Sequence, residues 1–277
     1  MRPFHRKQRP ELAISEGEMA RMTEELDQLH HEVGKPAMEA QVAAWADELR
    51  SGVRQSLSRR HFLVGTGGVL AGGAVLATLA THPTLAAAAA SGSSSSSSNP
   101  PNSQGGISGL SGDLAVVALA ASLENLAVSA YSQGISAAQA GKLGTVPPAV
   151  VTFATTAKSQ HMDHAAAWNA ILRAAGKDPV TITTPSLTPT VTADLAKVAN
   201  VTDLANLALT LENAAAQTYQ VQAAKLKSTK GIATASTIQP VEMQHAAVLY
   251  YALGEYPGVQ TSSGSPLAFN PTTEAVS

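Results

Sequence analysis

Leu119–Tyr131 reads LAASLENLAVSAY, and Leu207–Tyr219 repeats it as LALTLENAAAQTY. Both copies place a Leu-Glu-Asn triplet in an apolar run of helical period, and both have a Tyr seven residues after the Glu. A second pair of segments repeats in the same order, because His161–Trp168 (HMDHAAAW) aligns with Glu242–Leu249 (EMQHAAVL). Internal self-similarity of this kind predicts two related helical hairpins, and hence a four-helix bundle.

Three carboxylates stand alone in these apolar runs. Glu124, Glu212 and Glu242 are each the only charged residue of the helical run that contains them. A helix that is apolar nearly all round must be buried, and its carboxylate is then buried with it. Such burial is costly unless the group is paired, hydrogen-bonded or bound to a cation.

Histidines fall in the same runs. Residues three apart share a helix face, so His161 and His164 project together, as do Glu242 and His245. The only histidines of residues 111–256 are these three, so none is left for an ordinary surface position. A cage of carboxylates and imidazoles suits iron, manganese or zinc. The predicted metal ligands are Glu124, His161, His164, Glu212, Glu242 and His245.

The order Glu, x-x-His, Glu, E-x-x-H resembles the ferritin-like family of carboxylate-bridged dimetal bundles over residues 111–256. Glu124 and Glu212 match the two single-Glu helices of that family, and Glu242 with His245 matches one E-x-x-H pair. The resemblance implies an all-α, antiparallel four-helix bundle that binds one or two ions of iron or manganese. It also implies redox chemistry with oxygen or peroxide, or ferroxidase-type oxidation.

His161 stands where the family has a Glu. A neutral imidazole brings no negative charge and binds through one nitrogen, whereas a carboxylate can bridge two ions. We therefore expect one well-occupied ion and a weaker or empty second position. The first would lie near Glu212, Glu242 and His245, and the second near Glu124, His161 and His164.

A different class of protein also fits these residues. In a metal-free envelope or stress-related bundle, the polar cluster would be a structural remnant whose Glu–His hydrogen bonds satisfy the buried charges. The chain has no cysteine, which excludes disulfides, thiolate zinc and iron–sulfur sites. A net charge of −2 gives no electrostatic basis for nucleic-acid binding. The sequence leaves the reaction, and whether the protein is an enzyme, open.

Residues 1–57 differ in kind, because they carry most of the chain's charge. Such a composition favours a solvated leader, partly helical or disordered. The alternative is a cytoplasmic anchor or partner helix, since Trp45 lies on the apolar side of a helical pattern over 40–54.

Ser58–Leu63 (SRRHFL) resembles a twin-arginine export signal, and the uncharged, glycine-diluted run 62–79 suits its apolar region. Residues 58–90 are therefore a predicted signal, cleaved near Ala87, or a membrane anchor through 62–79. The expected partner is the twin-arginine export machinery. The expected location is periplasmic, extracellular or anchored on the outer side of the cytoplasmic membrane.

The remaining boundaries follow from composition. Residues 91–110 read as a Ser/Gly/Pro linker, 111–256 as the bundle and 257–277 as an irregular tail. We expect a monomer or dimer. The predicted helices span 112–140 and 147–175, then a third from Thr192 or Thr202 to 225–230, and a fourth over 233–253 with a kink or start at Pro240. Residues 181–190 are predicted to be an extended crossover or an external loop.

Overall fold

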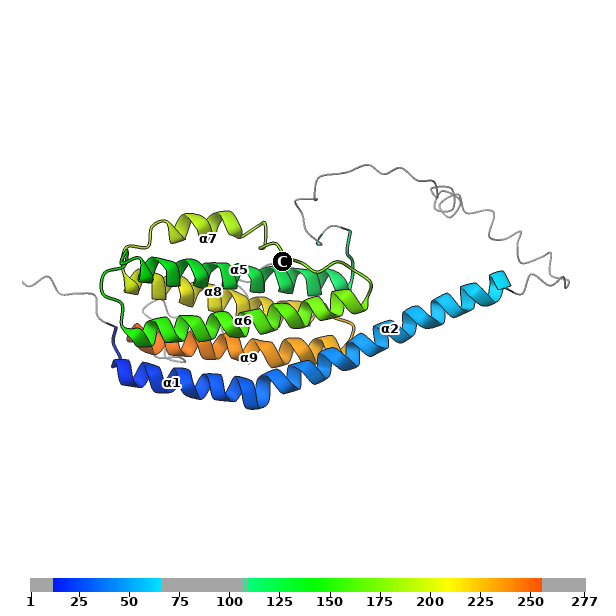
Figure 1. Ribbon diagram of the computed structural model, residues 1–277, viewed down its shortest axis with the longest axis horizontal. Helices are drawn as coiled ribbons and strands as arrows, with labels where there is room; N and C mark the ends of the chain where they lie inside the picture. The colour runs from blue at the N-terminus through cyan, green and yellow to red at the C-terminus, as the bar shows by residue number, and fades with distance from the viewer. Residues whose placement is uncertain (1–11, 66–106, 108, 256–277) are drawn as a thin grey trace, which may run out of the picture. The chain divides into compact units, whose positions relative to one another are not determined.

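A computed structural model describes residues 12–65, 107 and 109–255, with side chains described up to residue 52 of the first range. These residues form helices and no strand, which confirms the all-α prediction (Figure 1). The helices that carry the repeats are α5 (Asp113–Gln139), α6 (Pro148–Ala174), α8 (Val201–Ala223) and α9 (Thr229–Ala252).

The four helices form an antiparallel bundle of two hairpins, α5 with α6 and α8 with α9. The register of α5 against α8 shows that these two also run in opposite directions. At the start of α5, Asp113 accepts a hydrogen bond of 2.8 Å from the backbone N–H of Ser228, just past the end of α8. Near the end of α5, Gly134 lies against Leu204 at the start of α8. The predicted antiparallel bundle is therefore confirmed.

Local sequence signals explain the helix ends. Pro148 opens α6, where the missing N–H of a proline costs nothing. The Asn200 side chain caps α8 by accepting from the N–H of Asp203, so the helix starts close to the predicted Thr202. Helix α9 starts after Ser228, whose side chain accepts from Gly231, and continues through Pro240. The predicted alternative start at Pro240 is therefore wrong.

The crossover between the hairpins runs along α5 and contains one short helix, α7 (Thr188–Leu195). Helix α7 lies beside α5 (Figure 1). Val191 of α7 packs with Leu126 and Ala130 of α5. Asn125 ties the extended part of the crossover to α5 by donating to the carbonyl of Val180 at 3.0 Å. The prediction of an extended crossover holds up to this helix, and Thr192 belongs to α7 rather than to the start of α8.

An N-terminal arm, defined here as residues 12–50, belongs to the same compact unit as the bundle. It consists of α1 (Glu16–Leu29), a π-helical segment η1 (His30–Gly34) and the first part of α2 (Lys35–Gly65). Its buried apolar side chains join the bundle core, so the expectation of a solvated leader is wrong for the arm. These side chains are Met19, Leu26, Met38, Val42, Trp45 and Ala46.

Several predicted segments lie wholly or largely outside the described residues. They are the signal or anchor at 58–90, its apolar run 62–79, the linker 91–110 and the tail 257–277. Among the described helices, α5 is long and apolar enough to cross a membrane by length and composition. In this structure it is a core helix of the bundle, and Glu124 lies on its buried side.

Candidate metal centre

All six predicted ligands meet at one point in the bundle core. Each of the six residues is at most 2% exposed. One comes from α5, two from α6, one from α8 and two from α9, so each of the four helices contributes. This group, called the cage below, consists of Glu124, His161, His164, Glu212, Glu242 and His245.

His161 lies between the two single-Glu helices. Its Nδ1 donates to Glu124 Oε2 at 2.8 Å, and its Nε2 donates to Glu212 Oε1 at 3.3 Å. On the other side of Glu212, the Nδ1 of His245 donates to Oε2 at 3.2 Å. The residue that departs from the family pattern thus occupies the space between two carboxylates.

Glu242 is the one cage carboxylate without a hydrogen bond. Both of its oxygens are buried and have no hydrogen-bond partner among the described residues. The nearest nitrogens belong to His164, whose Nδ1 lies 3.0 Å from Oε1, and His161, whose Nδ1 lies 3.6 Å from Oε2. A buried carboxylate left in this state is costly, and a cation would satisfy it. The residues present therefore fit a metal ion.

The geometry offers two overlapping positions for an ion. In each, one ligand atom from every member lies within 4.8 Å of the others. Glu242 and His161 belong to both groups, so either residue would serve an ion at each position. The groups are Glu124, His161, His164 and Glu242, and His161, Glu212, Glu242 and His245.

The imidazoles and carboxylates stabilise each other's charged forms. Burial raises the pKa of Glu124, but the positive charges of His164 and His161 outweigh it and leave that pKa at about 2. Burial lowers the pKa of His164, but the Glu124 charge raises it to about 9. The Glu212 carboxylate, against its burial, likewise holds the pKa of His245 above its usual value. The metal-free cage thus pairs carboxylates with imidazolium ions, and a metal ion must displace protons to bind.

Two tyrosines hold the single-Glu carboxylates from across the bundle. The Tyr131 hydroxyl donates to Glu212, and the Tyr219 hydroxyl donates to Glu124. Burial and the neighbouring carboxylates raise the pKa of both tyrosines well above the usual value, so both stay protonated donors. The sequence contained the signal, since each Tyr follows a Glu by seven residues, but each Tyr serves the Glu of the other repeat.

Gln160 fixes the orientation of His245 from outside the cage. Its amide nitrogen donates to Asp27 of the arm at 3.2 Å, which turns its oxygen toward His245. That oxygen accepts from the Nε2 of His245 at 2.9 Å. The proton on Nε2 is therefore held in place, and Nδ1 is the nitrogen that can ligate an ion. Sequence analysis missed this contact, because Asp27 lies in the segment interpreted as a leader.

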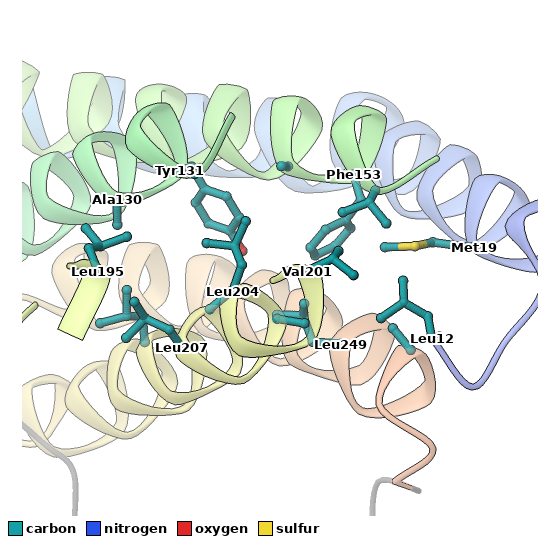
Figure 2. A pocket seen from close by; sticks show the side chains of 17 residues that line it. Leu12, Met19, Ala130, Tyr131, Phe153, Leu195, Val201, Leu204, Leu207 and Leu249 are labelled. Atoms are coloured by element: carbon teal, nitrogen blue, oxygen red, sulfur yellow. The ribbon is translucent and has the colours of Figure 1, made fainter. Parts of the chain in front are cut away.

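An apolar cavity of about 50 Å³ adjoins the cage at Tyr131. Figure 2 shows its lining, in which Tyr131 and Phe153 face Leu204 and Leu249, and Met19 of the arm closes one end. The Tyr131 hydroxyl points out of this lining to Glu212. A small apolar molecule in the cavity would therefore be one side chain away from the cage.

Comparison with known proteins gives one match. A family model described as a ferritin-like domain matches residues 112–255, which is 144 of the 277 residues. A search of curated proteins and a search of solved structures each found no match. The matched residues include the whole cage and exclude the arm.

Proposed function

The chain belongs to the ferritin-like domain family, and from this premise we propose that its cage binds one or two transition-metal ions, iron or manganese. The observation that carries the proposal is the Glu242 carboxylate, which is fully buried and has no hydrogen-bond donor among the described residues. Its two oxygens lie beside nitrogens of other candidate ligands, with His164 Nδ1 3.0 Å from Oε1 and His161 Nδ1 3.6 Å from Oε2.

The two positions are expected to differ in affinity. The cage supplies three carboxylates, whereas a cage with Glu at position 161 would supply four. Fewer negative charges raise the cost of a second divalent cation in a buried site. We propose that the position at Glu212, Glu242 and His245 fills first, because Gln160 already orients the His245 ring.

A bound iron or manganese ion would supply redox chemistry with oxygen or peroxide, or ferroxidase-type oxidation. The chain's own residues would hold the site in shape and keep water out. Tyr131 donates to Glu212 Oε1, the oxygen that also contacts His161, and Tyr219 donates to Glu124 Oε1. The apolar cavity beside Tyr131 would admit a small apolar molecule but no charged one (Figure 2).

A second function is favoured by a different observation. The contacts of His161 with Glu124 at 2.8 Å and of His245 with Glu212 at 3.2 Å pair these charges without any metal. A metal-free envelope or stress-related bundle would use the cage in this way. In that function the Glu242 carboxylate is held by ion-pair contacts alone, the nearest to His164 Nδ1 at 3.0 Å, and accepts no hydrogen bond from the described residues, so metal binding is the better account.

Metal addition is expected to raise the unfolding temperature of the metal-free protein. An ion that binds only the folded state stabilises it by about 2.7 kcal/mol at a hundredfold excess over its Kd. Glu212→Gln should remove most of this stabilisation, because it deletes a charged ligand. Glu255→Gln is the matched control, since Glu255 is exposed and lies outside the cage. An unfolding temperature unchanged by iron, manganese and zinc in the wild type would favour the metal-free function.

We further propose that the chain is exported through the twin-arginine machinery, with residues 58–90 as its signal or membrane anchor. The support is the SRRHFL motif and the uncharged run after it. The docked arm adds a condition, because a helix packed on the bundle lies on the same side of a membrane as the bundle. Export must therefore follow undocking of the arm or carry the arm along.

Replacing Arg59 and Arg60 together by Lys is expected to trap the protein in the cytoplasm, because the twin-arginine machinery reads the paired guanidinium groups. Cell fractionation with antibodies against the bundle and against the arm measures both parts. A mature protein that starts near Ala87 would have lost the arm, whereas an anchored protein would keep it. Undiminished export of the double variant would contradict the proposal.

A further inference from the structure

The cage has no open route to solvent through its own residues. All six members are at most 2% exposed, and the arm covers α6 and α9 beside them. An ion that reaches such a site needs intermediate ligands, because a bare cation cannot cross an apolar interior. A second cluster of ligand-type side chains lies between the cage and solvent.

That outer cluster consists of His30 and His31 of η1 and Asp163 of α6. One ligand atom from each of the three lies within 4.8 Å of the others. The side chains become less exposed in steps toward the cage, from His31 at 53% through Asp163 at 23% to His30 at 1%. The His30 ring then meets the ring of the cage residue His164, with their centroids 5.6 Å apart.

We propose that the outer cluster is a loading site, which captures a divalent transition-metal ion at the surface and passes it to the cage through His164. The inference rests on the proposed metal binding of the cage. Imidazole nitrogens with a carboxylate oxygen suit the same ions as the cage does. The arm thus supplies a metal-handling function that the matched ferritin-like residues 112–255 do not contain.

The carboxylate of the cluster already holds a cationic side chain. The Lys35 ammonium nitrogen lies 2.8 Å from Asp163 Oδ1, while His30 Nε2 lies 3.3 Å from the other oxygen, Oδ2. Lys35 is partly exposed and has a flexible side chain, so an incoming ion can displace it at modest cost. The buried Nδ1 of His30 has no hydrogen-bond partner, so the described protein groups do not satisfy this ring fully.

The local backbone supports a role beyond packing. The π-helical turn at His30–Gly34 interrupts an otherwise α-helical arm, and such turns concentrate at functional sites. A purely structural reading is that Asp163, Lys35 and His30 only fasten the arm to α6. In that structural role His31 would contribute only an exposed ion pair with Asp27 at 3.6 Å, which adds little stability.

Stopped-flow loading of Co²⁺ into the full-length, metal-free protein separates these readings, because the absorption of cobalt reports its coordination. His31→Ala and Asp163→Asn are each expected to slow loading of the cage about tenfold. This is the lower end of the effect that loss of a residue supporting a metal ligand has on metal affinity or activity. The final cobalt-to-protein ratio should stay at the wild-type value. Lys35→Met should speed loading, because the competing cation is gone.

Asp194→Asn is the matched control, since it breaks an exposed Asp–Lys pair of 2.7 Å outside the cluster. Wild-type loading rates in both His31→Ala and Lys35→Met would overturn the loading site and leave cage binding intact. Failure of the wild type to bind cobalt, iron or manganese at all would instead overturn the proposed function. His31→Ala changes an exposed residue, so a folding defect does not confuse the result.

Discussion

Glu242→Gln is expected to remove nearly all metal from the protein. Glu242 belongs to both candidate ion positions, whereas Glu124 and Glu212 each belong to one. Loss of an outer-sphere partner already lowers metal affinity about 10–100-fold, so loss of a shared charged ligand should lower it by at least about 100-fold at both positions. Glu124→Gln and Glu212→Gln should each affect one position only.

The metal-to-protein ratio is measured for the three variants, with Glu255→Gln as control. It should be lowest in Glu242→Gln. The amide keeps the size of the side chain, and circular dichroism at the helical bands checks that the bundle is intact. If Glu242→Gln retained as much metal as Glu124→Gln, the carboxylate would not be shared. The two-position arrangement would then be wrong.

Trp45→Ala is expected to destabilise the protein by about 3–5 kcal/mol, the usual cost of truncating a buried aromatic side chain. Trp45 is 3% exposed and joins the core that α5, α6 and α9 form. Chemical denaturation of the full chain measures the loss. A loss within about 0.5 kcal/mol, the usual range for surface substitutions, would contradict docking of the arm.

Gly231→Ala probes the same contact from the other side. Replacing a glycine within a helix by alanine normally stabilises the folded protein by about 0.5–1 kcal/mol. At Gly231, however, an added Cβ would lie 2.8 Å from the Trp45 ring, so the substitution should destabilise. Gly17 in α1 has no atom within 4 Å of its would-be Cβ, and Gly17→Ala should stabilise.

The combination of the two changes gives the sharpest form of the test. In the Trp45→Ala background the steric conflict is gone, so Gly231→Ala should become neutral or stabilising. The non-additivity of the double variant would then measure the contact directly. Additive effects of Trp45→Ala and Gly231→Ala would mean that the arm does not pack on α9.

The positions of the cage residues could be predicted because the two repeats place them at matching positions of their helices. Two helices each carry one Glu in an apolar run, and the other two carry the i,i+3 pairs His161/His164 and Glu242/His245. In a buried bundle these polar groups have few partners except one another. The tyrosine contacts could not be predicted, because they depend on how far α5 is shifted along α8. Only the antiparallel register places Tyr131 opposite Glu212 and Tyr219 opposite Glu124.

The arm was misjudged because its charge concealed its apolar face. Met19 and Leu26 lie on the buried side of α1, and Met38, Val42 and Trp45 lie on the buried side of α2. The two sets do not share one helical period, since the π-turn η1 shifts the pattern between them. A search for a single period therefore finds two short patterns in a charged segment, which is also what a solvated helix shows.

The number of metal ions bound per chain decides whether the cage holds metal. Elemental analysis of the full-length protein, purified from cells supplied with iron and manganese, gives this number. We predict at least one and at most two ions per chain. A ratio near zero, unchanged after anaerobic incubation with either metal, would contradict the claim.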